Sequence, residues 1–135
     1  MKGSGVLTGR SGSIGKFTYI EGEYWPHNTA LYVKDFHGNS PKYIFYLFHT
    51  VDFKRHKSGV SVPTLNRNFI HEELVGVAKK DEQDEIVKIL NKVDEKISWE
   101  ENKNGTLSSL FKSMLQLFMT GQVRVKDIDF GEIHV

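Results

Sequence analysis

Apolar residues in the second half of the chain recur at the spacing of one helix face. Two groups each advance in steps of 4, 3 and 4 residues, and they begin 21 residues, or three heptads, apart. Steps of three and four place side chains on the same face of an α-helix. We call these eight positions the seam: Ile86, Leu90, Val93, Ile97, Leu107, Phe111, Met114 and Phe118.

The shared phase of the two groups predicts one long helix, from about Asp81 to Met119, with Glu100 and Asn104 at the intervening seam positions. Gly105 opposes this, but a glycine costs only about 1 kcal/mol in a helix interior. Such a helix spans roughly 57 Å, more than a globule of this size needs. The seam is therefore expected to face a coiled-coil partner. Two helices hinged at Asn104-Gly105, or a helix folded against its own domain, remain the alternatives.

The first half has the pattern of short strands separated by turns. The segments "GVLTG", "KFTYI" and "TALYVKDF" are rich in β-branched and aromatic residues, and the glycines of "GRSGSIGK" predict a hairpin. Pro41 to about Lys54 has helical spacing, with Ser40 as a plausible N-cap. The segment "ELVGV" that follows is expected to form a further strand.

Together these elements predict an α+β fold. Residues 1–80 form a small β-rich globular domain with a short helix, 81–120 form the long coiled-coil helix, and 121–135 form a tail with a short C-terminal strand. The chain of 135 residues has no cysteine, which excludes disulfides and thiolate metal sites. It also has no apolar run of membrane-spanning length and no signal-peptide pattern, so a cytoplasmic protein is expected.

The net charge of +1 hides an asymmetry between the two halves. Residues 1–70 contain nine Lys/Arg and four Asp/Glu, whereas 71–135 contain nine and thirteen, giving +5 and −4. A basic half favours a polyanion such as nucleic acid, although a solvated surface would have the same composition.

Three motifs with catalytic associations do not fit. In "GRSGSIGK" the P-loop spacing is one residue too long and Phe17 replaces Ser/Thr. In "HEELV" the second zinc-binding His is replaced by Val75. Asp94-Glu95-Lys96 is typical of a solvated helix face. The sequence therefore gives no reason to expect an enzyme or a metal site.

Two segments carry a family resemblance. The first is "LTGRSGSIGKFTYIEGEYWPHNTALYVKD" with "GVSVPTLNRNFIHEELVGV", and the second is "DEQDEIVKILNKVDEKI" followed by "LFKSMLQLFMTGQVRV". Together they resemble the C-terminal part of a type I restriction-modification specificity subunit. The first segment is similar to the later portion of a target-recognition domain, and the second to the conserved helix that follows it.

The resemblance implies a non-catalytic subunit. In this family two recognition domains each read half of a bipartite DNA site, and two antiparallel helices separate them and dock the methyltransferase subunits. The adenine methyltransferase and the motor-nuclease subunit bring S-adenosylmethionine, ATP and Mg²⁺, so this chain is expected to hold no cofactor. It has one recognition domain, without the usual opening strands, and one helix. A natural half-subunit, a truncated gene product and a fragment all remain open, and a homodimer is expected.

The resemblance makes basic and amide residues of the first half candidate contacts to double-stranded DNA. Arg10 and Asn28 are the favoured base readers because each lies beside a turn, whereas lysines more often hold phosphates. In "SGVSVPTLNRNFI", Pro63, Leu65 and Asn66 resemble a structural latch. The alternative function is a truncated dimerisation remnant that no longer reads DNA. The full candidate set is Arg10, Lys16, His27, Asn28, Lys54, Arg55, Lys57 and Arg67.

Overall fold

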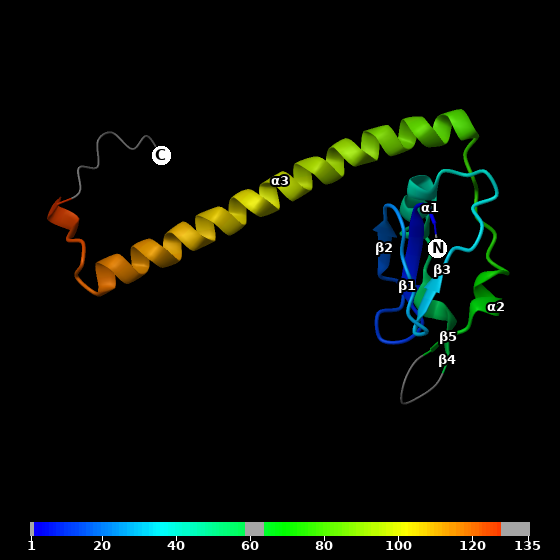
Figure 1. Cartoon of the computed structure of the whole chain (residues 1–135), viewed down its shortest axis with the longest axis horizontal. Helices are drawn as coiled ribbons and strands as arrows, with labels where there is room; N and C mark the ends of the chain where they lie inside the picture. The colour runs from blue at the N-terminus through cyan, green and yellow to red at the C-terminus, as the bar shows by residue number, and fades with distance from the viewer. Residues whose placement is uncertain (1, 59–63, 128–135) are drawn as a thin grey trace. The chain divides into compact units, whose positions relative to one another are not determined.

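The computed structural model describes residues 2–58 and 64–127 and has the predicted α+β fold. The chain divides into two compact units, Met1–Leu90 and Asn91–Val135. The first unit holds the strands and short helices, and the long helix α3 begins in it and continues into the second (Figure 1).

A three-stranded antiparallel sheet forms the base of the first unit. The central strand β1 (Gly5–Gly9) pairs with β2 (Phe17–Ile20) on one side and with β3 (Ala30–Tyr32) on the other. The β1–β2 connection is the predicted glycine-rich hairpin, in which Gly12 and Gly15 adopt positive φ angles of 75° and 76°. Its Ile14 is 4% exposed, because the loop folds back to deliver this side chain to the core.

A second, smaller sheet lies next to the end of β1. It consists of β4 (Lys57–Ser58) and β5 (Thr64–Leu65), and a bridge from Ser11 to Thr64 connects it to the chain that leaves β1. Leu65 is 2% exposed and packs with Ile14 and Phe53. This side chain therefore attaches the segment that the sequence suggested as a latch to the hydrophobic core. Pro63 lies outside the described residues.

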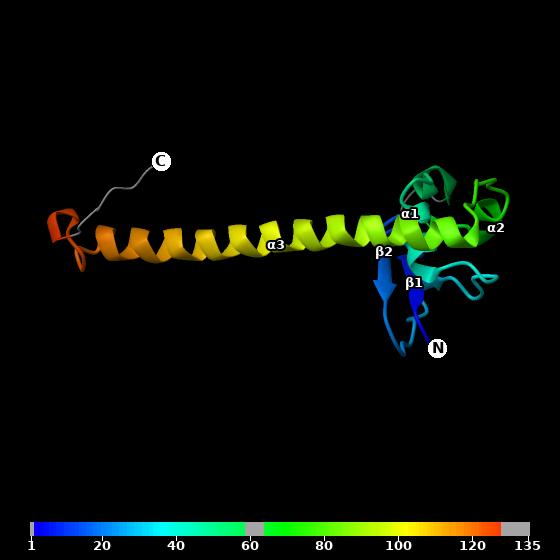
Figure 2. The same cartoon turned by 90° about the horizontal axis from the view of Figure 1, so that it is seen from above.

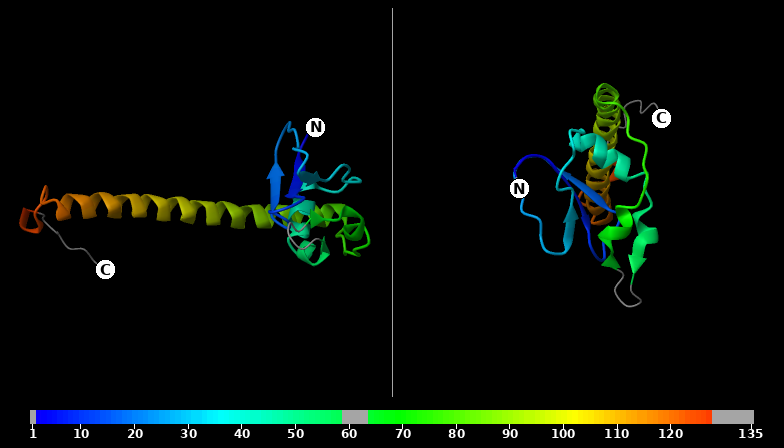
Figure 3. Two further views of the ribbon diagram at one scale, coloured as in Figure 1. Left: turned by 90° about the horizontal axis from the view of Figure 1, so that it is seen from below. Right: turned by 90° about the vertical axis from the view of Figure 1, so that its right-hand side faces the viewer.

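Helix α1 (Pro41–Phe48) packs against β1 and β2 (Figure 3). It starts at the predicted residue but ends well before Lys54. The chain turns at His49 and Thr50, and a 3₁₀ helix, η1 (Phe53–His56), then brings Phe53 into the core. The apolar residues whose spacing predicted one longer helix therefore belong to two elements, α1 and the separate 3₁₀ helix η1.

The predicted strand at "ELVGV" is wrong. After the short helix α2 (Arg67–Ile70), the chain runs to α3 without regular secondary structure, and Leu74 is 98% exposed. Its β-forming residues find no neighbouring strand to pair with among the described residues. The segment is held at both ends, because Glu73 pairs with Arg55 and the Ala78 N–H donates to the Tyr43 hydroxyl at 3.0 Å.

Helix α3 (Lys80–Met119) is continuous for 40 residues, which confirms the predicted single helix (Figure 2). It passes through Asn104 and Gly105 without a hinge, so the two-helix alternative is excluded. After α3 the described chain has turns and a 3₁₀ helix, η2 (Val125–Asp127). It forms no strand up to Asp127, and the rest of the predicted strand region, 128–135, lies outside the described residues.

The first turn of α3 is attached by a buried polar residue to the part of the first unit that precedes it, which we call the globule. Gln83 is 2% exposed, and its Oε1 accepts a hydrogen bond from the Ser40 N–H at 2.9 Å. Its amide nitrogen donates to Asn39 Oδ1 at 2.7 Å and to the Ala78 carbonyl at 2.9 Å. One amide side chain therefore joins the start of α3 to the residues just before α1.

Candidate nucleic-acid interface

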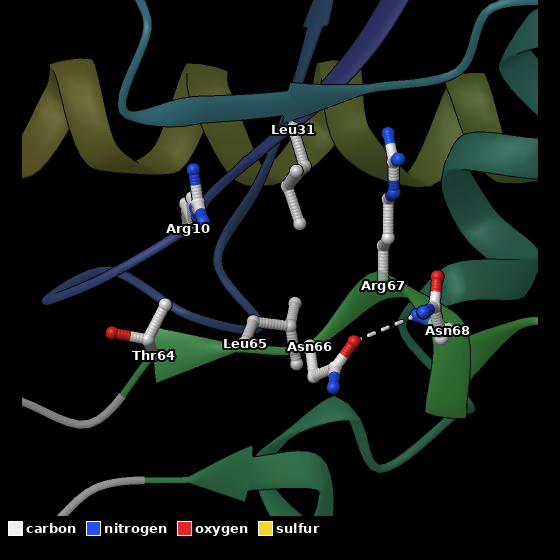
Figure 4. Close-up of a pocket in the computed structure, with 7 residues that line it drawn as sticks. All are labelled: Arg10, Leu31, Thr64, Leu65, Asn66, Arg67 and Asn68. Carbon is white, nitrogen blue, oxygen red and sulfur yellow. Dashed lines mark hydrogen bonds between the residues drawn. The ribbon is translucent and has the colours of Figure 1, made fainter.

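A cavity of about 490 Å³ opens where β1, β3 and β5 come together (Figure 4). Two guanidinium groups lie on either side of it, and the Leu31 side chain points in from β3 between them. None of its lining residues is acidic. They are Arg10, Leu31, Thr64, Leu65, Asn66, Arg67 and Asn68.

Arg10 directly follows β1 and is held by its backbone on both sides. Its N–H donates to the Thr29 carbonyl, and its own carbonyl accepts from the Leu65 N–H, both at 2.8 Å. The first bond comes from the turn before β3 and the second from β5. The backbone is thus fixed while the exposed side chain is free to meet a ligand.

Arg67 is the first residue of α2, on the opposite side of the cavity (Figure 4). The local turn is set by Asn66, whose side-chain oxygen accepts a hydrogen bond from the Asn68 backbone N–H at 3.0 Å. Within residues 2–58 and 64–127, neither Arg10 nor Arg67 forms an ion pair. Among the described residues, these two positive charges of the cavity thus have no acidic partner.

His27 and Asn28 lie in the exposed loop that leads into β3. His27 Nδ1 is 3.0 Å from the Thr29 hydroxyl, which orders the imidazole ring. Because Thr29 also accepts the backbone bond from Arg10, this loop adjoins the rim of the cavity. Trp25 in the same loop is 92% exposed.

Lys16 and Lys54 lie on a different part of the first unit. Lys54 lines a shallow depression of about 270 Å³ that also includes Gly15, the residue before Lys16. Both lysines are exposed. The backbone of Lys57 belongs to β4, but its side chain lies outside the described residues.

Arg55 has a partner that sequence analysis did not supply. Its guanidinium forms a hydrogen-bonded ion pair with Glu73, and His56 Nε2 lies 2.8 Å from the same carboxylate oxygen. The bond from Arg55 is the main reason that the pKa of Glu73 is lowered, and the same bond raises the pKa of Arg55. The charge of Arg55 is thus compensated within the fold.

The seam is exposed along most of α3. Ile86, Leu90 and Phe118 are partly covered, whereas the other seam residues range from 40% exposed at Met114 to 66% at Phe111. Four further exposed apolar residues occupy helix positions next to the seam, namely Ile89, Leu110, Leu115 and Leu117.

The family model for the type I restriction modification DNA specificity domain matches residues 1–109. The chain belongs to this family. The match includes every described cavity residue and the first part of α3, and it confirms the resemblance seen in the sequence. No solved structure matches the chain.

Membership gives this specificity domain a role in a type I restriction-modification system as a specificity component, which is a non-catalytic class. Among the described residues, no group of three or more His, Asp or Glu is placed to hold a metal ion. None of the described helices combines the length and apolarity needed to cross a membrane.

Besides the partner of Arg55, sequence analysis missed two features of this specificity domain. The first is Gln83, although the seam extended three residues back from Ile86 reaches it, so its spacing was a usable signal. The second is the meeting of Arg10 and Arg67 in one cavity with Thr64 and Asn68. No local pattern carries that information, because the two arginines are brought together only by the β1–β5 contact.

Proposed function

We propose that the chain recognises DNA and assembles a type I restriction-modification complex, positioning methyltransferase and motor-nuclease subunits on a bipartite site. The observation that carries this proposal is the exposed seam on a helix that begins at a basic, DNA-specificity globule. S-adenosylmethionine, ATP and Mg²⁺ are then the partners' cofactors, and the complex works in the cytoplasm.

The order of the seam supports a second copy of this chain as one partner. If a copy lies antiparallel so that residue 102 of both helices is at the same level along the helix axis, seam residues meet in pairs whose numbers sum to 204. Ile86 then faces Phe118, Leu90 faces Met114, and the polar pair Glu100 and Asn104 face each other. A two-fold contact requires such a self-complementary surface. The remaining pairs are Val93 with Phe111 and Ile97 with Leu107.

The width of the apolar surface supports a further partner. A two-stranded coiled coil needs only the seam, whereas helices that pack on more than one neighbour carry apolar residues beside it. Ile89, Leu110, Leu115 and Leu117 are such residues, and they are 38–63% exposed. This extra surface suits a methyltransferase subunit that docks along the paired helices.

The experiment is selection of DNA from a randomised duplex library by the chain, with and without the adenine methyltransferase subunit. A two-fold dimer presents the same recognition surface twice, so the enriched sequence should be an inverted repeat of one half-site at a fixed spacing. Enrichment of a single, unrepeated site would contradict the dimer. No enrichment in either arm would contradict DNA recognition.

The alternative is a dimerisation remnant that does not read DNA. The pairing of Arg55 with Glu73 favours it, because this removes one candidate cation from the DNA-facing set. The salt dependence of duplex binding separates the two. With about four phosphate contacts, log K should fall with log[salt] at a slope of roughly −3.6, and replacing Lys54, Arg55 and Lys57 with Ala should flatten it. A slope near zero would favour the remnant.

A further inference from the structure

The shape of the Arg10–Arg67 cavity restricts which part of DNA it can meet. Base edges of a duplex lie at the bottom of a groove, so they are reached by protein elements that project outward. The sugar-phosphate backbone is the part of DNA that projects, and it fits a hollow. The cavity is a hollow, bounded by Leu31 and the well-buried Leu65, so it suits the backbone.

The chemistry of the lining leads to the same class of ligand. A guanidinium group offers five N–H donors and no acceptor, in a fork that matches two oxygens of one phosphate. Two such groups flank the cavity, and the Asn66 side-chain oxygen is already engaged by the Asn68 N–H. The cavity thus presents donors around an apolar floor, which suits a phosphate joined to a deoxyribose.

We propose that this cavity binds one phosphodiester of the DNA backbone. Arg10 and Arg67 approach the non-bridging oxygens from opposite sides, and Leu31 contacts the sugar. The inference rests on the proposed DNA-binding function and changes the expected role of Arg10, from a base reader to a phosphate-holding residue. Base reading then falls to other residues, with Asn28 in the adjoining turn the remaining favoured candidate.

The backbone bonds around the cavity favour tight binding of the phosphate. Arg10 is fixed by bonds to Thr29 and Leu65, and Thr64 is bridged to Ser11, so both walls are joined before any ligand arrives. A preformed site loses less conformational entropy on binding than one that must be assembled. A phosphate held between two fixed walls would also fix the orientation of the recognition unit on the duplex, which is what phosphate contacts generally do.

The first test is the salt dependence of duplex binding by the full chain. Arg10→Gln and Arg67→Gln act on the same phosphate, so together they should reduce the magnitude of the slope of log K against log[salt] by about 0.9. Each should also weaken binding by the same factor on the preferred duplex and on an unrelated one. Arg124→Gln, which removes the same charge outside the cavity, should leave slope and affinity unchanged. Loss confined to the preferred duplex would identify base reading and overturn the proposal, as would cavity variants that behave like Arg124→Gln.

The second test does not require DNA binding. Dimethyl phosphate, a single phosphodiester, is added to the isotope-labelled chain while the side-chain Nε–H signals of the arginines are followed by NMR. Signals of Arg10 and Arg67 should shift and saturate, and Arg10→Gln should abolish the saturable shift at Arg67. Weak, unsaturated shifts shared by Arg124 would overturn the cavity proposal. Saturation at the cavity in a chain that fails to bind duplex would retain the site and reject the proposed function.

Discussion

The globule and the long helix differ in the solvent exposure of their apolar side chains. In the globule they are enclosed, as at Val6 and Leu65, which are 1% and 2% exposed. Along α3 beyond Leu90 they face solvent, and Phe111 is 66% exposed. Near the start of the helix the buried residue is instead a polar one, Gln83. The globule encloses a core of its own, whereas the helix has an exposed apolar surface, which a second molecule covers in the function proposed above.

The largest expected effect is the loss of the proposed dimer when charges are placed on the exposed seam of the helix. In the proposed dimer, Leu90→Asp combined with Phe111→Asp would bury unpaired charges, which typically costs about 3–5 kcal/mol for each broken site. The double variant should therefore be a monomer by light scattering at micromolar concentration, while the globule remains folded.

The matched control places the same two charges on the opposite helix face. Asn102 and Ser109 are exposed and lie away from the seam, so Asn102→Asp with Ser109→Asp should leave the dimer intact. A wild-type chain that is already monomeric at this concentration would refute the dimer itself.

A second prediction tests whether the polar contact at the start of α3 stabilises the globule. Gln83→Leu removes the acceptor used by the Ser40 N–H and the donor used by Asn39. Leaving these partly buried polar groups unsatisfied should lower the free energy of unfolding of the globule by about 1–3 kcal/mol in urea denaturation. The neighbouring exposed change Asp84→Ala should alter it by less than about 0.5 kcal/mol. Equal effects from both variants would show that the Gln83 bonds do not stabilise the globule.

The same substitution should have opposite signs in the two regions. A methyl group added at Gly105 in α3 meets nothing within 4 Å, so Gly105→Ala should stabilise the helix by about 1 kcal/mol. A methyl group at Gly5 in β1 would overlap the Tyr24 ring, so Gly5→Ala should destabilise the globule by about 1–3 kcal/mol. Circular dichroism during thermal unfolding measures both. A stabilising Gly5→Ala would refute the packing described for β1.

The smallest expected effect is a pH dependence confined to the globule. The bond from Arg55 holds the pKa of Glu73 below its ordinary value of 4.5. A depressed pKa means that the pair stabilises the fold above that value, and that the contribution disappears as pH falls through the folded-state pKa. Glu73→Gln should therefore remove part of the acid sensitivity of globule unfolding, and leave helix unfolding unchanged. An identical acid profile in the variant would mean that the pair contributes nothing measurable.

How far the sequence predicted this molecule depends on whether a feature is local. The start and end of α3 were predicted within a residue or so, because seam spacing and phase are properties of the segment itself. The strand predicted at "ELVGV" was wrong because a strand must pair with another strand, and the residues of a segment do not show whether a partner lies beside it. The end of α1 was wrong because Phe53 reaches the core from η1 rather than from the same helix.

The candidate site shows the same limit. Arg10 and Arg67 could each be selected as basic residues beside turns, but their shared cavity depends on the hydrogen bond between Leu65 and Arg10 and on the bridge beside it. The pairing of Arg55 with Glu73 likewise joins residues that sequence analysis had no reason to connect. Residue type was predictable from sequence, and the grouping of residues was not.

The exposed seam also has a consequence for protein concentration. Covering it with the proposed second copy is a bimolecular event, so by mass action the stability of α3 should rise with the amount of chain present, whereas that of the globule should not. At low concentration the stretch from Asn91 to Met119 would open more often and become the preferred site of proteolytic cleavage. Cellular supply of the chain would then control its lifetime, because only copies that find a partner are protected.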